Sequence, residues 1–258
     1  MNRHLISSPD ELYSALSSGR ILAGDFLLLR SGLYQGQFIS SLNGISELPI
    51  QIMPFENDQV VIEGGLWVKG QNTIWRNLEL RGDWRNHQRG TSDANELRID
   101  GIQTQFMNCV IHDMAQMGLW SPAHDSEIYG TLFFNMGVSG DKSRMKHTLY
   151  LQNEEGEKRI TNCIFMPGFS EYGIHAYAEK GTLNGLIFDG IIHAGRRWQI
   201  GGKAPFDNTE VRNSFTYKTD LRAGYYLTAE NGSIVFEGNN FAGFLQLLNP
   251  SRWSMKRN

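Results

Sequence analysis

The chain has 258 residues, of which 40% are hydrophobic and 20% are charged, and its formal net charge at pH 7 is −3. A weakly acidic chain offers no electrostatic attraction for phosphate groups, so nucleic acid is not an expected partner. The longest apolar runs, such as residues 26–29, are far too short to cross a bilayer, so membrane insertion is not expected either.

The amino terminus reads MNRHLISSPDELY and lacks the apolar stretch that a secretory signal needs. We therefore expect a protein of the cytoplasm or of a virion, or an extracellular protein whose signal has been removed. The sequence alone does not choose among these compartments.

Residues 8–19 have the pattern of a short amphipathic helix. Ser8 fits the N-cap, Pro9 the first helical position and Glu11 the third, which is a capping-box arrangement. Leu12 and Leu16 then fall on one face, and Gly19 can end the helix. Such a helix can cover the open end of a stack of strands.

Three strand-like segments follow, in the order 24–36, 48–52 and 60–65. The first begins Gly24-Asp25 and ends in Gly-Leu-Tyr, the second is Leu-Pro-Ile-Gln-Ile, and the third is Val-Val-Ile-Glu-Gly-Gly. Together with the preceding helix, this order resembles the opening of right-handed parallel β-helix proteins of the pectate-lyase-like group. It is most similar to the amino-terminal turns of chondroitinase B and alginate lyase relatives. The resemblance implies the fold for residues 8–80 and, more generally, a polysaccharide as substrate.

A second signature recurs along the rest of the chain: apolar residues around Asn or Gly, just before another strand. Seven segments fit, at 74–80, 106–112, 128–134, 160–165, 186–192, 211–215 and 236–241. Asn and Gly tolerate the left-handed backbone of a tight corner, so the repeats predict the corners of a solenoid. Cys109 and Cys163 follow two of these Asn residues and are expected to be buried free thiols without a metal or disulfide role.

Four segments of alternating character begin at residues 147, 172, 196 and 223, and are therefore spaced by 24 to 27 residues. Aligned as stacked strands, they place Leu149, Ile174, Trp198 and Tyr225 in one inward column. The alternation then turns three further columns outward: Tyr150, His175, Gln199 and Tyr226; Gln152, Tyr177, Gly201 and Thr228; and Glu154, Glu179, Lys203 and Glu230. Extending the first outward column backward adds Trp120 and Arg98.

A straight row of aromatic and polar groups suits a linear polymer. We therefore assign substrate binding to Arg98, Trp120, Tyr150, Gln152, Glu179, Gln199 and Tyr226, with an acidic polysaccharide as the partner. The resemblance implies β-elimination, which needs a base for the proton next to the carboxylate and a cation to stabilise the enolate. The candidate catalytic residues are His175 or Tyr177 as base, with Arg197 and Lys203 polarising the carboxylate.

The resemblance also makes calcium a candidate cofactor, because lyases of this group use calcium or an arginine to neutralise the carboxylate and a Lys or Arg as base. The sequence has no clear match to the Asn-x-Glu calcium ligands of the alginate-lyase relatives; Asn153-Glu154-Glu155 comes nearest. No metal ligand is assigned.

Two other functions stay open. Glycoside hydrolysis needs two carboxylates across the scissile bond, and Glu154, Glu179 and Asp100 are available, although the motifs of pectin hydrolases are missing. A non-catalytic carbohydrate-binding or structural β-helix, for example in a virion, is the other alternative. Such structural proteins carry a long apolar outer stripe, and the sequence indicates no clear second apolar face.

The sequence thus predicts an all-β protein, a single-stranded right-handed parallel β-helix that forms one domain over residues 1–258. Residues 8–19 are its amino-terminal cap and residues 244–258 its carboxy-terminal cap or tail. Its expected activity is cleavage of a uronic-acid polysaccharide by β-elimination, and its oligomeric state is left open.

Overall fold

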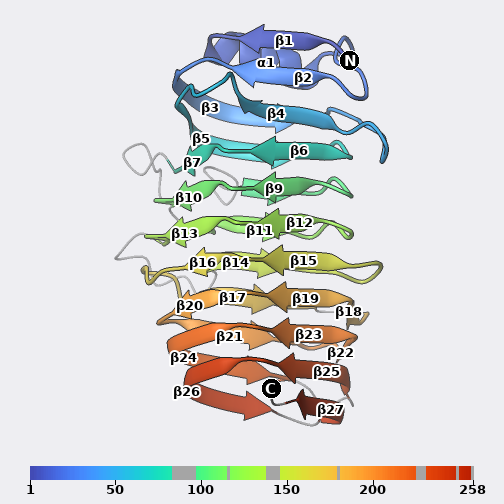
Figure 1. The fold of residues 1–258 in the computed structure, drawn as a ribbon, viewed down its shortest axis with the longest axis vertical. Coiled ribbons are helices and arrows are strands. Elements are labelled where there is room, and N and C mark those ends of the chain that lie inside the picture. Colours follow the sequence, from blue (N-terminus) through green and yellow to red (C-terminus); the bar gives the residue numbers. More distant parts are fainter. Residues whose placement is uncertain are drawn as a thin grey trace.

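The chain folds as a right-handed parallel β-helix of about eight coils, with one short helix at its amino-terminal end (Figure 1). The computed structural model describes residues 1–82, 97–114, 117–137, 146–178, 181–224, 231–247 and 250–256. The predicted fold class is confirmed. Every registered pairing between the named strands is parallel, as expected when each coil stacks on the next.

Helix α1 (Pro9–Ser17) covers the first coil, as the sequence predicted. The Ser8 hydroxyl accepts a hydrogen bond from the Glu11 backbone N–H at 3.2 Å, and the Glu11 carboxylate accepts one from the Ser7 N–H at 2.6 Å. Leu12 and Leu16 are fully buried beneath the helix. The helix is nine residues long, and no helix in the described ranges is long and apolar enough to span a membrane.

One sheet of eleven strands runs the length of the molecule, at the front of Figure 1. Its strands, in spatial order, are β1 (Arg3–Ile6), β2 (Phe26–Leu29), β4 (Ile50–Pro54), β6 (Thr73–Arg76), β9 (Gln105–Met107), β12 (Glu127–Tyr129), β15 (Lys158–Thr161), β19 (Leu186–Asp189), β23 (Thr209–Arg212), β25 (Asn231–Glu237) and β27 (Pro250–Lys256). We call the outer surface of this sheet face 1.

The second sheet has fourteen strands and bends into two faces. Face 2 consists of β7 (Glu79–Arg81), β10 (Val110–His112), β13 (Leu132–Phe134), β16 (Ile164–Phe165) and β20 (Ile192–Ala194). Face 3 consists of β8 (Leu97–Ile99), β11 (Leu119–Ser121), β14 (His147–Leu151), β17 (Tyr172–Ala176) and β21 (Arg197–Ile200). The longer strands β3 (Gly32–Ser40), β5 (Val60–Val68), β24 (Phe215–Ala223) and β26 (Asn240–Leu247) contribute to both faces. A two-stranded sheet, β18 (Leu183–Asn184) with β22 (Phe206–Asp207), lies at the side.

The predicted Asn and Gly corners join face 1 to face 2 in each coil. All seven have the left-handed backbone, with φ between 46° and 66°, at Asn77, Asn108, Gly130, Asn162, Gly190, Asn213 and Gly238. A Cβ atom at Gly130 would lie 2.4 Å from the Asn108 side-chain oxygen, and one at Gly190 would lie 2.4 Å from that of Asn162. The corners therefore need Asn or Gly for their backbone, and at Gly130 and Gly190 need Gly to leave room for the neighbouring Asn.

The core is a continuous apolar column inside the coils. Phe133 and Phe165 stack at 4.7 Å in successive coils of face 2, and Trp75 stacks on Phe106 at 6.0 Å beneath face 1. Cys109 and Cys163 are buried free thiols, as predicted. Burial raises the pKa of each to about 12, so neither thiol is a reactive thiolate.

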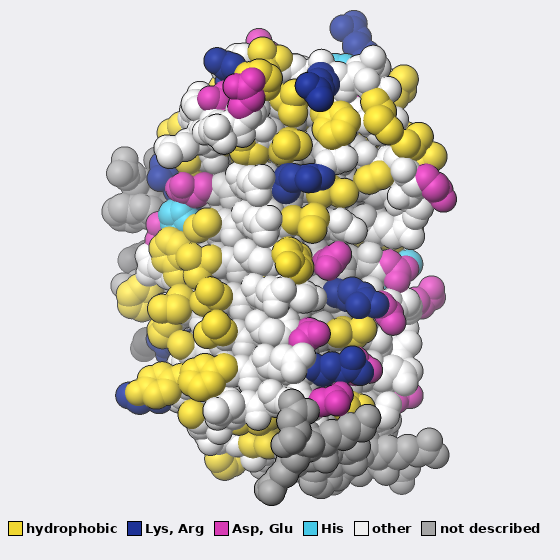
Figure 2. Space-filling view, viewed as in Figure 1, with side chains coloured by type: hydrophobic (Ala, Val, Ile, Leu, Met, Phe, Trp, Pro, Cys, Tyr) yellow, Lys and Arg dark blue, Asp and Glu magenta, His cyan; other side chains and the backbone are white. Residues whose placement is uncertain are grey.

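The expectation of no second apolar outer face is wrong. Large apolar side chains are exposed on face 2, where Figure 2 shows them gathered on the left of the molecule. The sequence pattern did not reveal them because strands of two or three residues are too short to display an alternation.

Candidate functional site

The predicted outward column exists on face 3. Strand pairing places Arg98 beside Trp120, Trp120 beside Tyr150, Tyr150 beside His175, and His175 beside Gln199. Trp67 of β5 precedes Arg98 at the amino-terminal end. We call this row, with its continuation at Arg222, the face 3 column.

The last predicted member of the column is wrong. Gln199 pairs with Arg222, and Trp198 pairs with Leu221 rather than with Tyr225. The chain reaches face 3 early because β24 runs through this corner as one strand, with only an irregularity around Lys218, whose φ is 51°. Tyr226 and Glu179 lie outside the described residues.

Arg98 forms a stacked unit with two tryptophans. Its guanidinium carbon lies 4.0 Å from the centre of the Trp120 ring and 4.8 Å from that of Trp67. Asp100 fixes the unit, because its two oxygens accept one bond from Arg98 Nε at 2.8 Å and one from Trp67 Nε1 at 2.7 Å. Aromatic surface and charge are therefore held rigidly at this end of the column.

Two histidines and three tyrosines form a close aromatic cluster in the middle of the column. The His175 ring stacks on Tyr172 at 4.3 Å and lies 4.7 Å from His147, 5.2 Å from Tyr177 and 5.4 Å from Tyr150. These rings enclose His175 and leave it 7% exposed. His175 thus occupies its predicted place in the outward column, but the surrounding rings bury it.

Both histidines are uncharged at neutral pH. Burial, with smaller contributions from His147 and Arg197, lowers the pKa of His175 to about 3. Burial also lowers the pKa of His147 to about 4. His175 Nδ1 lies 3.5 Å from His147 Nε2, so one neutral ring can donate to the other.

Several buried polar atoms along this column have no hydrogen-bond partner in the described structure. They are Trp120 Nε1, His147 Nδ1, His175 Nε2, and both amide atoms of Gln199, a residue with no exposed surface. Other unpartnered buried atoms are more scattered: Trp198 Nε1 and His193 Nε2 belong to the interior, and Arg76 Nε and Arg212 Nε lie on face 1. Unpaired buried polar groups cost stability, so a row of them on one surface indicates a place for water or a ligand.

Tyr177 and Lys203 lie on neighbouring coils at the edge of face 3. The Tyr177 ring packs against Gly202, where a Cβ atom would come within 2.4 Å of the ring. Lys203 follows directly in the chain, is exposed, and has no carboxylate partner among the described residues. Gln152 is half-buried one coil before Tyr177.

Arg197 is already neutralised by neighbouring carboxylates. It lies 3.5 Å from a Glu171 oxygen and 3.5 Å from an Asp220 oxygen, and it donates to the Tyr172 hydroxyl at 3.1 Å. Arg222 makes two contacts with Asp220, at 2.8 and 2.6 Å. Lys203 is thus the better placed of the two predicted cations for an incoming carboxylate.

The calcium site that the resemblance implies does not fit the described residues. No group of three or more His, Cys, Asp or Glu side chains in the described ranges could hold a metal ion. Asp100 is saturated by Trp67 and Arg98, which also leaves it poorly suited to act in glycoside hydrolysis. Glu154 is exposed, and Glu179, its expected partner, lies outside the described residues.

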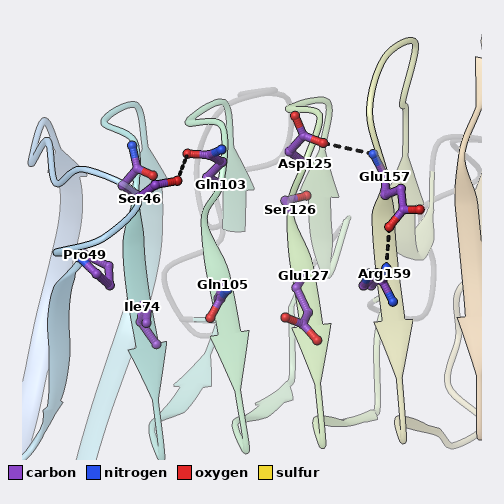
Figure 3. A pocket seen from close by; sticks show the side chains of 11 residues that line it. Ser46, Pro49, Ile74, Gln103, Gln105, Asp125, Ser126, Glu127, Glu157 and Arg159 are labelled. Atoms are coloured by element: carbon purple, nitrogen blue, oxygen red, sulfur yellow. Dashed lines mark hydrogen bonds and ion pairs between the residues drawn. The ribbon is translucent and has the colours of Figure 1, made fainter.

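Two cavities lie away from the column, on face 1. One of about 340 Å³ is drawn in Figure 3, and a second of about 470 Å³ continues it past Glu157. Asp125, Glu127 and Glu157 line the first, and its one arginine, Arg159, is paired with Glu157. A surface with this surplus of carboxylates repels an acidic polymer, so face 3 is the better candidate for such a substrate.

Comparison with known proteins agrees with the fold. The alginate lyase from Paenibacillus sp. str. FPU-7 matches with a TM-score of 0.68 and 16% identity over 96% of this chain and 98% of that one. Pectate lyase Pel9A matches with a TM-score of 0.66 and 12% identity over 97% and 78% of the two chains. A rhamnogalacturonan lyase matches with a TM-score of 0.65 and 14% identity over 92% of this chain and 74% of that one.

No protein-family model and no curated protein matches the sequence itself. At identities of 12 to 16%, the three structural matches establish a shared architecture and leave the chemistry to be argued from the residues of this chain. The architecture is that of a pectate-lyase-like β-helix.

Proposed function

We propose that this chain binds an acidic polysaccharide along face 3 and cleaves it by β-elimination. The observation that carries the proposal is the row of unpartnered polar atoms at Trp120, His147, His175 and Gln199. They lie between aromatic rings and next to cationic side chains, which are the groups that bind sugar rings, hydroxyls and carboxylates. The fold likeness to alginate, pectate and rhamnogalacturonan lyases supports this substrate class.

Tyr177 is the favoured base. It is partly exposed, whereas His175 is enclosed and its pKa of about 3 makes it a poor proton acceptor. In the proposed step Tyr177 acts as the phenolate: its oxygen takes the proton from the carbon next to the carboxylate, and Lys203 stabilises the charge that develops on that carboxylate. The bond to the leaving glycosidic oxygen then breaks, a carbon–carbon double bond forms, and the proton passes to the leaving oxygen.

The unsaturated product absorbs in the ultraviolet, so activity can be measured directly on a panel of uronic-acid polymers, with and without calcium. Tyr177→Phe should lower kcat by about a hundredfold or more with KM little changed, because only proton transfer is lost. Lys203→Ala should raise KM as well as lower kcat. Tyr13→Phe, which removes an exposed hydroxyl from α1, is the matched control and should behave as wild type.

Absence of unsaturated product from every polymer would reject cleavage by elimination. Non-catalytic binding is the second candidate, and it is favoured by the neutralised state of Arg98, Arg197 and Arg222. In that case affinity electrophoresis should still show retardation by one of the polymers, and Trp120→Ala should abolish it. Loss of both cleavage and retardation would leave face 3 without its proposed ligand.

A further inference from the structure

Face 2 carries a continuous apolar surface that the proposed activity does not use. Ile164, Ile192 and Phe215 lie side by side in successive coils and are 37%, 45% and 42% exposed. Met166, Tyr217 and Phe169 flank them with exposures of 46%, 51% and 55%. We call these six residues the face 2 stripe; Figure 2 shows apolar side chains massed on this side of the molecule.

The stripe residues are not core residues that failed to find room inside the coils. Between its members, Phe165, His193 and Thr216 point inward and are 1% exposed each, so the interior of these coils is already filled. The six exposed parts together amount to roughly 500 Å², which equals the largest apolar patches of ordinary monomers. Two such surfaces in contact would bury about 1,000 Å², the lower limit for a specific interface.

The two ends of face 2 carry opposite charge. At the end formed by β5, β7 and β10, Glu63 and Glu79 pair with Arg81, and His112 lies between Glu79 and Asp113, so the described side chains there include three carboxylates and one arginine. At the other end, formed by β20 and β24, Arg196 and Lys218 are exposed. Arg196 donates to the Gly168 carbonyl, and Lys218 lies 5.3 Å from the Tyr217 ring centre. Two carboxylates of this region, Glu171 and Asp220, are both paired with Arg197.

We propose that the face 2 stripe binds a second copy of this chain, in an antiparallel two-fold dimer. A two-fold axis perpendicular to the solenoid reverses the order of coils, so β7 of one copy faces β24 of the other and β10 faces β20. The acidic end of one copy then lies over the basic end of the other, across a row of about five coil steps of 4.8 Å. The strand registers place Asp113 level with Gly195 of the second copy, so Asp113 approaches Arg196. A parallel dimer would instead place like charges together at both ends.

The oligomeric state of the full chain at micromolar concentration, measured by sedimentation velocity and light scattering, tests the proposal. Wild type should be a dimer. Ile192→Ser should weaken it by at least about tenfold in dissociation constant, because each dimer loses the side chain twice. Ile39→Ser is the matched control: Ile39 is 43% exposed on the same sheet but outside the stripe, and its replacement should leave the dimer intact.

A charge exchange tests the antiparallel arrangement. Arg196→Glu alone should weaken the dimer, and adding Asp113→Lys should restore it, whereas in a parallel dimer the double variant would gain nothing from the exchange. Circular dichroism should show that all variants remain folded, since every substituted side chain is at least partly exposed. A monomeric wild type, a trimer, or a dimer indifferent to Ile192→Ser would overturn the proposal. These outcomes do not depend on whether face 3 is catalytic.

Discussion

Lys158 shows most clearly what the interior of the coils imposes on a single side chain. It has no exposed surface, and its Nζ donates to the Ser121 carbonyl at 2.6 Å and to the Ser121 hydroxyl at 2.8 Å, with no carboxylate partner among the described residues. Burial lowers the pKa of this amine well below its ordinary value of 10.5. An amine held in this way is most stable without its proton.

The shift gives stability a defined pH dependence. Between the lowered pKa of the folded state and the ordinary lysine pKa, the unfolded chain binds one proton more than the folded chain, so stability rises with pH across that window. Lys158→Met should therefore stabilise the fold, by roughly 1 to 3 kcal/mol near neutral pH, and should flatten the rise. The Ser121 carbonyl keeps its bond from the Gln152 N–H, so the substitution leaves it paired.

Urea unfolding of wild type and of Lys158→Met, from neutral pH to about pH 10, measures the free energy of unfolding of each and its pH dependence. Arg159→Met is the control, because Arg159 is the next residue of β15 but is exposed on face 1. A Lys158→Met variant less stable than wild type, with an unchanged pH dependence, would contradict a neutral buried amine.

Among the elements, β17 shows how a local irregularity serves the site. Its register against β21 shifts between Tyr172 and Ile174, so Gly173 is the extra residue of a bulge. The bulge coincides with the position at which the Tyr172 ring comes to stack on His175. A Cβ atom at Gly173 would lie 2.0 Å from His193 Nε2, so no larger residue fits there without movement of that ring.

Gly173→Ala should destabilise the protein by about 1 to 3 kcal/mol, because the packed His193 ring cannot move away from the added methyl group. Its ring lies between Phe165 and Trp198, and its Nδ1 is 2.9 Å from the Thr219 hydroxyl oxygen. Thermal and urea unfolding measure the loss. Gly19→Ala is the matched control, since no atom lies within 4 Å of the added methyl group.

Adding His193→Ser to Gly173→Ala opens the space and should recover part of the loss in a double-mutant cycle. Equal stabilities for Gly173→Ala and Gly19→Ala would show that the coil adapts more easily than the packing implies.

The sequence predicted the repeating elements better than the departures from the repeat. The corners at Asn108 and Asn162 need a left-handed backbone, which restricts these positions to residue types such as Asn and Gly. The column from Arg98 to Gln199 followed from alternation and spacing. The irregularity at Lys218 is not signalled by a residue type of this kind, so the predicted register of the last segment was wrong. The enclosure of His175 depends on rings from other coils, which no local pattern reveals.

At the scale of the whole molecule, a solenoid transmits stability from coil to coil, because each coil contacts only its neighbours. Helix α1 is the lid on the first coil, with Leu12 and Leu16 fully buried beneath it. Damage at this end should therefore spread over a limited distance and leave the central coils intact.

Leu16→Ala should cost about 2 to 5 kcal/mol locally. Hydrogen exchange followed by mass spectrometry should then show loss of protection in β1 to β3, while β12, β15 and β19 keep theirs. Tyr13→Ala, on the exposed side of the same helix, should change neither region. Equal loss of protection in every coil would instead indicate that the chain unfolds as one cooperative unit.

The residues at the corners restrict how many coils such a chain can gain or lose at once. From Asn108 onward they alternate between Asn and Gly, through Gly130, Asn162, Gly190 and Asn213 to Gly238. Since Gly130 and Gly190 each make room for the Asn of the preceding coil, the unit that fits onto its own copy is a pair of coils. From Asn108 onward, duplication or deletion of two coils preserves this alternation, whereas loss of one coil sets either Asn against Asn, as at Asn77 and Asn108, or Gly against Gly. We would therefore expect length variation in chains of this kind to proceed by even numbers of coils.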